Sequence, residues 1–389
     1  MKKTMRALVF DNERDDWEGS KGLRLEDVPR PVLQEREDPA DAEQVVVRPI
    51  FAGFCGSDRS IWHRRAFGES ILHSLEAEGK TKRVIGHEML GEIVDVGTLA
   101  ARKYGYRPRD IVSTESHIIC GKCFHCRTGE THICSDDIII GISRDGCFAE
   151  QIKLPAQTLW PTDTRRIRPE VGALQEPFGN AVHVSTKTDL NGKSVAVFGC
   201  GTIGLFTILI AHALGASRVI GVEPDKTHRE MALTLGADDV LSFEPASGPD
   251  SWKADPEVVA ELKRMCPPEG PDVCIEMAGP NGSVNNALRS VRRGGEVILF
   301  GLKAGDFTIQ RLDRTIMDGV TIHTVIGRRI FQTWYITKGL LESKNNRIQE
   351  RIWEIILREG DGTVVDLAGF EPDAFEKKID GNPKILLKI

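Results

Sequence analysis

The sequence has no apolar run long enough to span a membrane. The longest, IGLFTILIAHALGA at residues 203–216, is shorter than the roughly 20 residues that a transmembrane helix needs, and it contains His212. It therefore predicts a buried helix. Residues 1–16 also lack the long apolar region and small-residue cleavage site of a secretory signal. We expect a cytoplasmic protein without a membrane partner.

The sequence also lacks a strong excess of charge of one sign, and it contains few cysteines. The 57 acidic and 51 basic side chains give a formal net charge of −6 without a block of like charge, which argues against a nucleic-acid partner. Nine cysteines in 389 residues are few for a disulfide scaffold, and clustered cysteines in a reducing compartment more often bind metal. With 40% hydrophobic and 28% charged residues, the composition suits a globular protein of two domains.

The second half of the chain alternates strand-like and helix-like segments. Between residues 193 and 324, β-branched runs such as KSVAVFG and GEVILFGL alternate with amphipathic stretches, which predicts a doubly wound α/β domain with a parallel sheet. Residues 1–176 contain short segments separated by Gly, Pro and Asp, and we expect an antiparallel β-rich domain there. Near the end, residues 329–343 predict a helix, and PKILLKI predicts a strand that could rejoin either domain.

A glycine fingerprint marks the first turn of the predicted parallel sheet. VAVFGCGTIGLF spaces its glycines as G-x-G-x-x-G between a strand and a helix, and the next strand, RVIGVE, ends in an acid that can accept ribose hydroxyls. The acid favours NAD over NADP, although Lys226, His228 and Arg229 leave NADP open. The alternative is a glycine turn that binds another nucleotide or none. We assign cofactor binding to Gly199, Gly201, Thr202, Ile203, Gly204, Glu223 and His228.

Four cysteines form a second constellation. Cys120, Cys123, Cys126 and Cys134 are spaced C-x2-C-x2-C-x7-C, which can surround one tetrahedral Zn²⁺. Four thiolates leave no position for substrate, so the spacing indicates a structural rather than a catalytic site. An iron–sulfur cluster is the main alternative, and a set of unrelated buried cysteines is a weaker one.

The motifs together resemble a family. GFCGSD, GHEMLGEIVDVG, the four-cysteine lobe and VFGCGTIGLF occur in the order of the zinc-dependent medium-chain dehydrogenases and cover nearly the whole chain. The resemblance implies a GroES-like catalytic domain over residues 1–178 and 325–389, with a structural zinc lobe at about 115–136. It also implies a Rossmann NAD-binding domain over residues 179–324 and assembly as a homo-oligomer, a tetramer or dimer.

The resemblance further implies a second, catalytic zinc in each subunit. Cys55, His87 and Glu88 match its ligand positions, and Glu176 in GALQEPFGNAVH matches a fourth group that binds the metal or its water. Which of the two glutamates ligates stays open. Ser57 would pass the alcohol proton onward, and Asp58 would orient His87. Taken alone, a single Cys or a His-Glu pair is more often a core or surface feature.

Three longer stretches resemble the branch of the family that oxidises L-threonine to 2-amino-3-oxobutanoate: STESHIICGKCFHCRTGETHIC, QEPFGNAVH and GRRIFQTWY. They imply that Glu115 and His117 face the substrate, although both can equally be structural. Two departures stand out, since Ser60 replaces the usual relay histidine and residues 66–83 are longer than expected, as if a loop bordered the substrate pocket. The alternatives are a polyol or sugar dehydrogenase with the same mechanism and, more remotely, a non-enzymatic metal-binding interaction protein.

Overall fold

The computed structural model describes residues 3–389, which divide into two compact units. One comprises the chain up to Pro177 together with Ile352–Ile389, and the other comprises Phe178–Arg351. The chain passes from the first unit to the second between residues 177 and 178, within one residue of the expected boundary at 178/179. Residues 325–351, which were expected in the first unit, group with the second. Helices α12 (Gln332–Glu342) and α13 (Ile348–Arg351) contact each other there, and Arg351 donates to the main-chain oxygen of Leu235 at 2.8 Å.

The first unit is built from antiparallel sheets, as the sequence predicts. Its largest sheet has the order β10-β6-β5-β3-β18-β17, with β9 paired to β3, and smaller sheets have the orders β2-β1-β4 and β7-β8. The exception is the parallel pair of β17 and β18. The strands are β1 (Thr4–Asp11), β2 (Arg24–Pro29), β3 (Gln44–Phe54), β4 (Lys82–Val84), β5 (Glu88–Val96), β6 (Ile111–Thr114), β7 (His117–Ile118), β8 (Ile138–Ile139), β9 (Ile152–Pro155), β10 (Leu159–Pro161), β17 (Val364–Asp366) and β18 (Ile385–Lys388).

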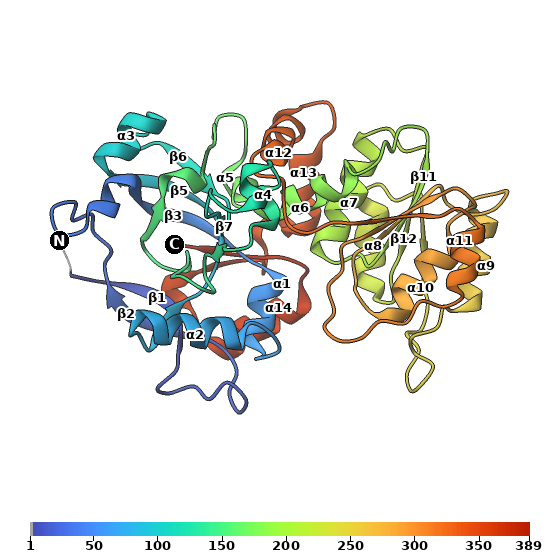
Figure 1. Ribbon diagram of the computed structural model, residues 1–389, viewed down its shortest axis with the longest axis horizontal. Helices are drawn as coiled ribbons and strands as arrows, with labels where there is room; N and C mark the ends of the chain where they lie inside the picture. Colours follow the sequence, from blue (N-terminus) through green and yellow to red (C-terminus); the bar gives the residue numbers. More distant parts are fainter. Residues whose placement is uncertain (1–2) are drawn as a thin grey trace. The chain divides into compact units, whose positions relative to one another are not determined.

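Short helices connect these strands (Figure 1). The predicted C-terminal strand rejoins the first unit as β18, where Ile385 pairs with Phe54 on β3. Residues 175–185 form a helix that continues into the second unit. The helices are α1 (Gly56–Trp62), α2 (Gly68–Glu78), α3 (Thr98–Tyr104), α4 (Phe124–Arg127), α5 (Pro169–Gly172), α6 (Gln175–Ser185) and α14 (Pro372–Gly381).

The long stretch at residues 66–83, expected as a loop, contains helix α2. Ile71 and Leu75 bury its apolar side in the core of the first unit. The guanidinium of Arg83, fully buried, donates to Glu78 at 2.7 Å and to Asp145 at 3.0 Å. A fixed helix replaces the expected loop because periodic apolar residues bury one side and the buried Arg83 forms ion pairs with two partly exposed acids at its end.

The second unit is the predicted doubly wound domain. Its six strands are all parallel and have the order β13-β12-β11-β14-β15-β16, which reverses direction at β11. Helices flank this sheet in Figure 1. The elements are β11 (Ser194–Phe198), β12 (Arg218–Val222), β13 (Asp239–Leu241), β14 (Val273–Glu276), β15 (Glu296–Leu299) and β16 (Thr321–Thr324), with α7 (Thr202–Ala213), α8 (Lys226–Leu235), α9 (Pro256–Met265), α10 (Asn281–Ser290) and α11 (Leu312–Met317).

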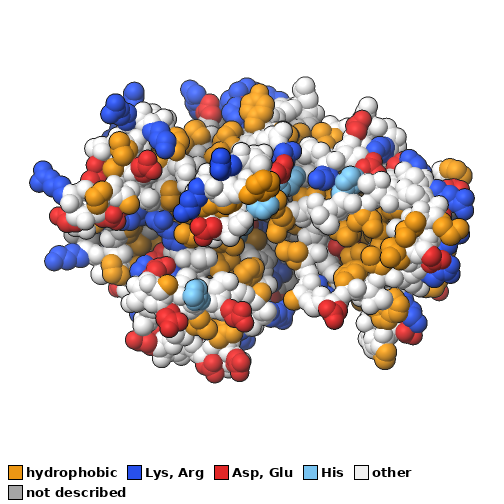
Figure 2. Space-filling view, viewed as in Figure 1, with side chains coloured by type: hydrophobic (Ala, Val, Ile, Leu, Met, Phe, Trp, Pro, Cys, Tyr) orange, Lys and Arg blue, Asp and Glu red, His pale blue; other side chains and the backbone are white. Residues whose placement is uncertain are grey.

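The segment that includes the edge strand β16 exposes many apolar side chains. Figure 2 shows hydrophobic side chains gathered over the part of the second unit where Figure 1 draws α11. The exposed residues are Leu302, Phe307, Ile309, Leu312, Ile316, Met317, Ile322 and Ile326, which we call the 302–326 apolar surface. Contiguous apolar surface of this kind marks an interaction site more often than chance exposure. Within residues 3–389, no helix has both the length and the apolar character that crossing a bilayer requires.

Candidate functional site

Three residues of the first unit converge as the sequence predicts for a catalytic metal centre. Cys55 follows β3, whereas His87 and Glu88 stand at the start of β5. The ligand atoms of these three side chains all lie within 4.8 Å of one another. One sulfur, one nitrogen and one carboxylate oxygen form a donor set that suits Zn²⁺ and leaves a fourth position open. Glu176 is buried near the set and acts electrostatically on Glu88.

Cys55 is held by the packing and hydrogen bonds around it. The ring of Phe54, the preceding residue, stacks on Phe148 with centroids 5.7 Å apart and meets Phe375 edge-on at 5.1 Å. On the other side, the main-chain N–H of Cys55 donates to Oδ2 of Asp58 at 2.8 Å, where helix α1 begins. The thiol is therefore fixed by the core behind it and by the helix start in front of it.

His87 lies between two side chains of helix α1. Its Nδ1 is 3.5 Å from Oδ1 of Asp58, and its Nε2 is 3.4 Å from Oγ of Ser57. Burial on its own lowers the pKa of His87, but Asp58 and Cys55 raise it well above its ordinary value. The surroundings thus favour positive charge at this position, which a divalent cation also supplies. Asp58 and Ser57 thus lie beside the two ring nitrogens of His87, and their roles in orienting His87 and relaying a proton stay predictions.

Glu88 is fully buried and has a partner that the sequence analysis did not identify. Its Oε2 accepts a hydrogen bond from Nζ of Lys384, which lies just before β18 and also donates to the main-chain oxygen of Phe54 at 3.1 Å. Burial raises the pKa of Glu88, the Lys384 ammonium lowers it and Glu176 raises it again, with a net increase. A Cβ at position 53 would stand 2.0 Å from Oε2 of Glu88, so a larger residue than glycine would have to displace this carboxylate.

The residues present fit a metal ion at this centre. Within residues 3–389, the buried polar atoms without a hydrogen-bond partner include Oδ1 of Asp58, Nδ1 of His87 and Oε1 of Glu88. Nδ1 of His87 and Oδ1 of Asp58 face each other at 3.5 Å, so Oε1 of Glu88 is the acceptor in this cluster that a cation would satisfy. A divalent cation bound by Cys55, His87 and Glu88 would satisfy Oε1 of Glu88 and strengthen the attraction between His87 and Asp58.

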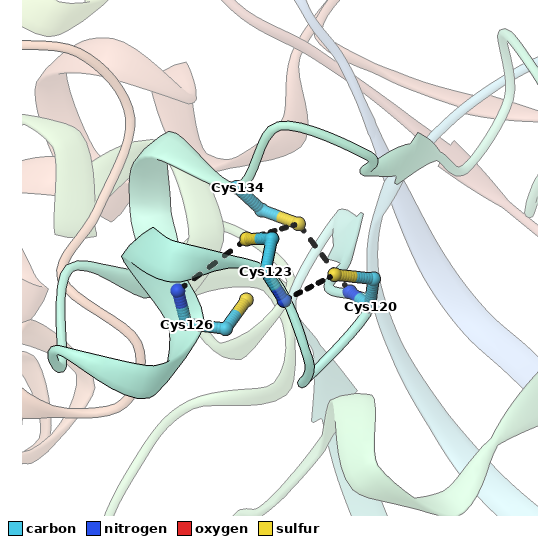
Figure 3. A group of neighbouring side chains, drawn as sticks. All are labelled: Cys120, Cys123, Cys126 and Cys134. Carbon is cyan, nitrogen blue, oxygen red and sulfur yellow. Dashed lines mark hydrogen bonds between the residues drawn. The ribbon is translucent and has the colours of Figure 1, made fainter.

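The four-cysteine lobe has the geometry of a closed metal site (Figure 3). Its sulfur atoms lie within 4.8 Å of one another, and main-chain N–H groups of Cys123 and Cys126 donate to the sulfurs of Cys120 and Cys123 at 3.3 and 3.5 Å. The N–H of Cys126 and its neighbours lower the pKa of Cys123 to about 6, whereas burial and adjoining thiols raise the pKa of Cys126 to about 12. The positive charge of a bound Zn²⁺ would offset the repulsion between neighbouring thiolates and hold all four cysteines in the thiolate form.

Glu115 and His117 belong to a second group beside that lobe. Glu115 is buried, and its Oε1 accepts from the main-chain N–H of His117 at 3.1 Å. The Nδ1 atom of His117 is 2.6 Å from Oδ2 of Asp137, which the sequence did not single out, and this contact lowers the pKa of Asp137. These contacts run within residues 115–137, so a role of either residue in substrate binding remains a proposal.

The glycine fingerprint of the second unit leaves room for a pyrophosphate. Gly199 has φ of +90°, and a Cβ at Gly204 would lie 1.9 Å from its carbonyl oxygen, so both positions require glycine. A Cβ at Gly201 would meet nothing within 4 Å, and α7 begins at the next residue, Thr202. Ile203 lies in the first turn of α7, and the first N–H groups of a helix have no intrahelical partner, which makes a helix start a general binding place for phosphate. The turn fits the phosphates of a dinucleotide.

Glu223 follows β12 at the expected place. Its carboxylate accepts from the N–H of Cys200 at 2.7 Å and of Asp225 at 3.0 Å, and each oxygen keeps capacity for a further hydrogen bond. His228 lies in the first turn of α8, where its N–H donates to Asp225 at 2.9 Å. Arg229 donates to the main-chain oxygens of Glu223 and Pro224 and is thereby tied to the turn.

Sequence and structure comparisons place the chain among known proteins. The alcohol dehydrogenase GroES-like domain model matches residues 41–164, and the zinc-binding dehydrogenase model matches residues 202–342. The chain is 35% identical to the L-threonine 3-dehydrogenase of Caldanaerobacter subterraneus subsp. tengcongensis, over 77% of this chain and 81% of that protein. It is 36% identical to the L-threonine 3-dehydrogenase of Pyrococcus horikoshii, over 77% of this chain and 80% of that protein. The solved alcohol dehydrogenase TADH from Thermus sp. ATN1 aligns with a TM-score of 0.79 and 25% identity over 99% of both chains.

Proposed function

We propose that this chain, which belongs to the zinc-binding alcohol dehydrogenase family, oxidises the secondary hydroxyl of L-threonine and passes the hydride to NAD. The product is 2-amino-3-oxobutanoate. The family predicted from the motifs is confirmed, as is the predicted combination of a GroES-like domain with a parallel-sheet nucleotide domain. The chain is a zinc-dependent oxidoreductase, so the non-enzymatic alternative is set aside.

The contrast between the two donor sets carries the mechanistic part of the proposal. The set of Cys55, His87 and Glu88 offers three ligands from buried or half-buried positions, whereas the lobe at residues 120–134 offers four sulfurs. Only the first leaves a metal position for substrate. When bound there, zinc supplies a Lewis acid that lowers the pKa of an alcohol hydroxyl.

The surrounding residues would hold and move protons. Oγ of Ser57, close to Nε2 of His87, is placed to accept the alcohol proton and pass it toward solvent or the cofactor ribose. Asp58 holds His87 at Nδ1 and keeps Nε2 free to bind metal. Ser60 replaces the usual relay histidine, and its Oγ donates to the main-chain oxygen of Gly56 at 3.1 Å. We propose that the relay ends at Ser57 and solvent.

Two observations support L-threonine as the substrate. The first is the printed names of the relatives described above. The second is the pair of Glu115 and His117, since the ammonium group of an amino acid needs a carboxylate or another acceptor once water is excluded. Asp137 holds Nδ1 of His117, so that Nε2 can serve as the acceptor. A polyol or sugar has no ammonium and no need for this group.

NAD is the proposed cofactor rather than NADP. A 2′-phosphate would meet the buried carboxylate of Glu223, and Arg229 is tied to the main chain of the turn rather than extended toward a ligand. Hydride acceptance is the chemistry of the nicotinamide ring itself.

We further propose that the protein is a homo-oligomer and lies in the cytoplasm. Strand β16 stands at the end of the sheet order, and the 302–326 apolar surface adjoins it. A second copy that pairs with this edge would extend the sheet and cover the apolar side chains. All nine cysteines are free, and a reducing compartment would keep the lobe thiols available for metal.

One assay separates the candidate substrates. NADH formation is measured with purified, zinc-loaded protein over L-threonine, butane-2,3-diol, sorbitol and glucose, and kcat/KM is compared. The proposal predicts that L-threonine has the highest value by on the order of 10²-fold or more, because unpaired buried polar groups penalise substrates without the ammonium. A higher kcat/KM for any of the other three would assign the chain to the polyol or sugar branch.

A further inference from the structure

Glu276 is a buried acid in the second unit that the mechanism above does not use. It ends strand β14 and is fully buried. Its Oε1 accepts three hydrogen bonds, from the main-chain N–H groups of Ala278 at 2.9 Å and Gly279 at 2.8 Å and from Oγ of Ser283 at 2.7 Å. One carboxylate oxygen therefore fixes the whole connection from β14 to the start of α10.

The same residue also holds the loop after the neighbouring strand. Its main-chain oxygen accepts from the N–H groups of Phe300 at 2.9 Å and Gly301 at 3.1 Å, just beyond β15. A Cβ at Gly301 would lie 2.3 Å from the nitrogen of Gly279 and 2.7 Å from Oε2 of Glu276. The two loops thus touch at Glu276, and only glycine fits at position 301.

The connection held by Glu276 adjoins the pyrophosphate turn. A Cβ at Gly199 would stand 3.0 Å from Cβ of Ala278, and the N–H of Met277 donates to Phe198 at 2.9 Å. Within residues 3–389, Oε2 of Glu276 belongs to the buried atoms without a hydrogen-bond partner. Burial raises the pKa of this carboxyl, although Ser283 and two N–H groups lower it. A buried carboxylate oxygen without a hydrogen-bond partner lowers the stability of the fold. Its presence at the carboxyl edge of the sheet therefore indicates a functional requirement.

The strand order shows which half of the cofactor lies there. Glu223 and the adenosine ribose belong to β12, on one side of β11, and β14 and β15 lie on the other. A dinucleotide spans the point where the order reverses, so its nicotinamide half falls beyond the carboxyl ends of β14 and β15. We propose that Glu276 is a positioning residue for the nicotinamide half of NAD, acting by fixing the two loops that border it. This rests on the cofactor assignment and not on the choice of substrate.

Two ligands test the proposal without turnover. Dissociation constants are measured by calorimetry for NADH and for ADP-ribose, which lacks the nicotinamide ring. In Glu276→Leu the three donors lose their acceptor, and we expect the Kd for NADH to rise on the order of tenfold while that for ADP-ribose stays within about twofold. Gly301→Ala retains Glu276 but displaces the loop, and the same selective loss is expected even if Glu276→Leu does not fold.

Asp272 offers a control at the opposite end of the same strand. It accepts from the N–H and Oγ of Ser194 at 2.8 and 2.7 Å, so Asp272→Asn should lower stability but change neither Kd by more than about twofold. The proposal is overturned if both test variants bind NADH as tightly as the unaltered protein, or if ADP-ribose weakens as much as NADH. Neither ligand contains threonine, so a failure of the substrate proposal leaves this comparison unaffected.

Discussion

Lys384 donates to Oε2 of Glu88 across 296 residues of sequence and also to the main-chain oxygen of Phe54 at 3.1 Å. The ammonium thereby joins the carboxylate of the proposed catalytic centre to the strand end that precedes Cys55. Burial lowers the pKa of Lys384, but Glu88 and Cys55 raise it above its ordinary value. The C-terminal strand β18 is what brings this cation to the centre, because Ile385 pairs with Phe54.

Lys384→Met tests that link. The change leaves the Glu88 carboxylate buried without its counter-charge, which typically costs about 3–5 kcal/mol. We expect the free energy of unfolding in urea to fall by that amount. Lys388→Met on the same strand alters an exposed side chain and should change it by less than about 0.5 kcal/mol. Equal effects of the two variants would show that the pair contributes nothing specific.

Cys55→Ser tests the assignment of the catalytic centre. Loss of the sulfur ligand should remove one of two zinc ions and reduce turnover by at least ~10³-fold, because the Lewis acid supplies several kcal/mol of transition-state stabilisation. Zinc is counted by mass spectrometry, and NADH binding, which belongs to the other unit, should persist. Cys266→Ala, at a buried cysteine of that unit, should keep both ions. Retained turnover in Cys55→Ser contradicts the assignment.

Cys123→Ser should affect the other site differently. Removing one of four thiolates weakens the binding of the metal. Because that binding energy is part of the folding energy of the lobe, the melting temperature should fall by several degrees. The measurement is calorimetric melting together with zinc content. Lost turnover at an unchanged melting temperature would show that the roles of the two sites are reversed.

Glu296 predicts a pH dependence of stability. Partial burial alone would raise its pKa, but hydrogen bonds from Thr188, Lys193 and His323 lower it from 4.5 to about 2. A lowered folded-state pKa stabilises the protein above the unfolded value, and the benefit disappears as the pH falls from about 4.5 toward 2. The melting-temperature difference between the unaltered protein and Glu296→Gln should therefore be full at pH 7 and shrink steadily below pH 4.5.

An exposed ion pair supplies the control for these melting-temperature measurements at different pH. Glu261 pairs with Arg264 on the surface of α9, where ion pairs contribute little. Glu261→Gln should leave the melting temperature nearly unchanged at every pH. A pH-independent difference for Glu296→Gln would mean that its charge is not what stabilises the fold.

Local patterns made much of the account predictable from the sequence. The four-cysteine spacing and the glycine fingerprint each lie within a few turns of chain, so their chemistry and geometry can be inferred together. Cys55 and His87 are further apart, and only the family resemblance related them. The same holds for Ser57 and Asp58, whose expected neighbour, His87, the structure places beside both.

Other contacts depend on pairings that no local pattern encodes. Lys384 reaches Glu88 through the register of β18 on β3, and Asp137 meets His117 because β7 pairs with β8. Glu276 reads as an ordinary strand residue until the two loops that it holds are seen together. Helix α2 was expected as a loop because its apolar residues, Ile71 and Leu75, are few and its closing partner, Asp145, lies far along the chain.

The most direct test follows a single hydrogen atom. L-threonine carrying deuterium at the hydroxyl-bearing carbon is incubated with NAD and the zinc-loaded protein, and the NADH formed is analysed by mass spectrometry. Hydride transfer from that carbon predicts NADH with one deuterium. Unlabelled NADH, or none, would contradict the account.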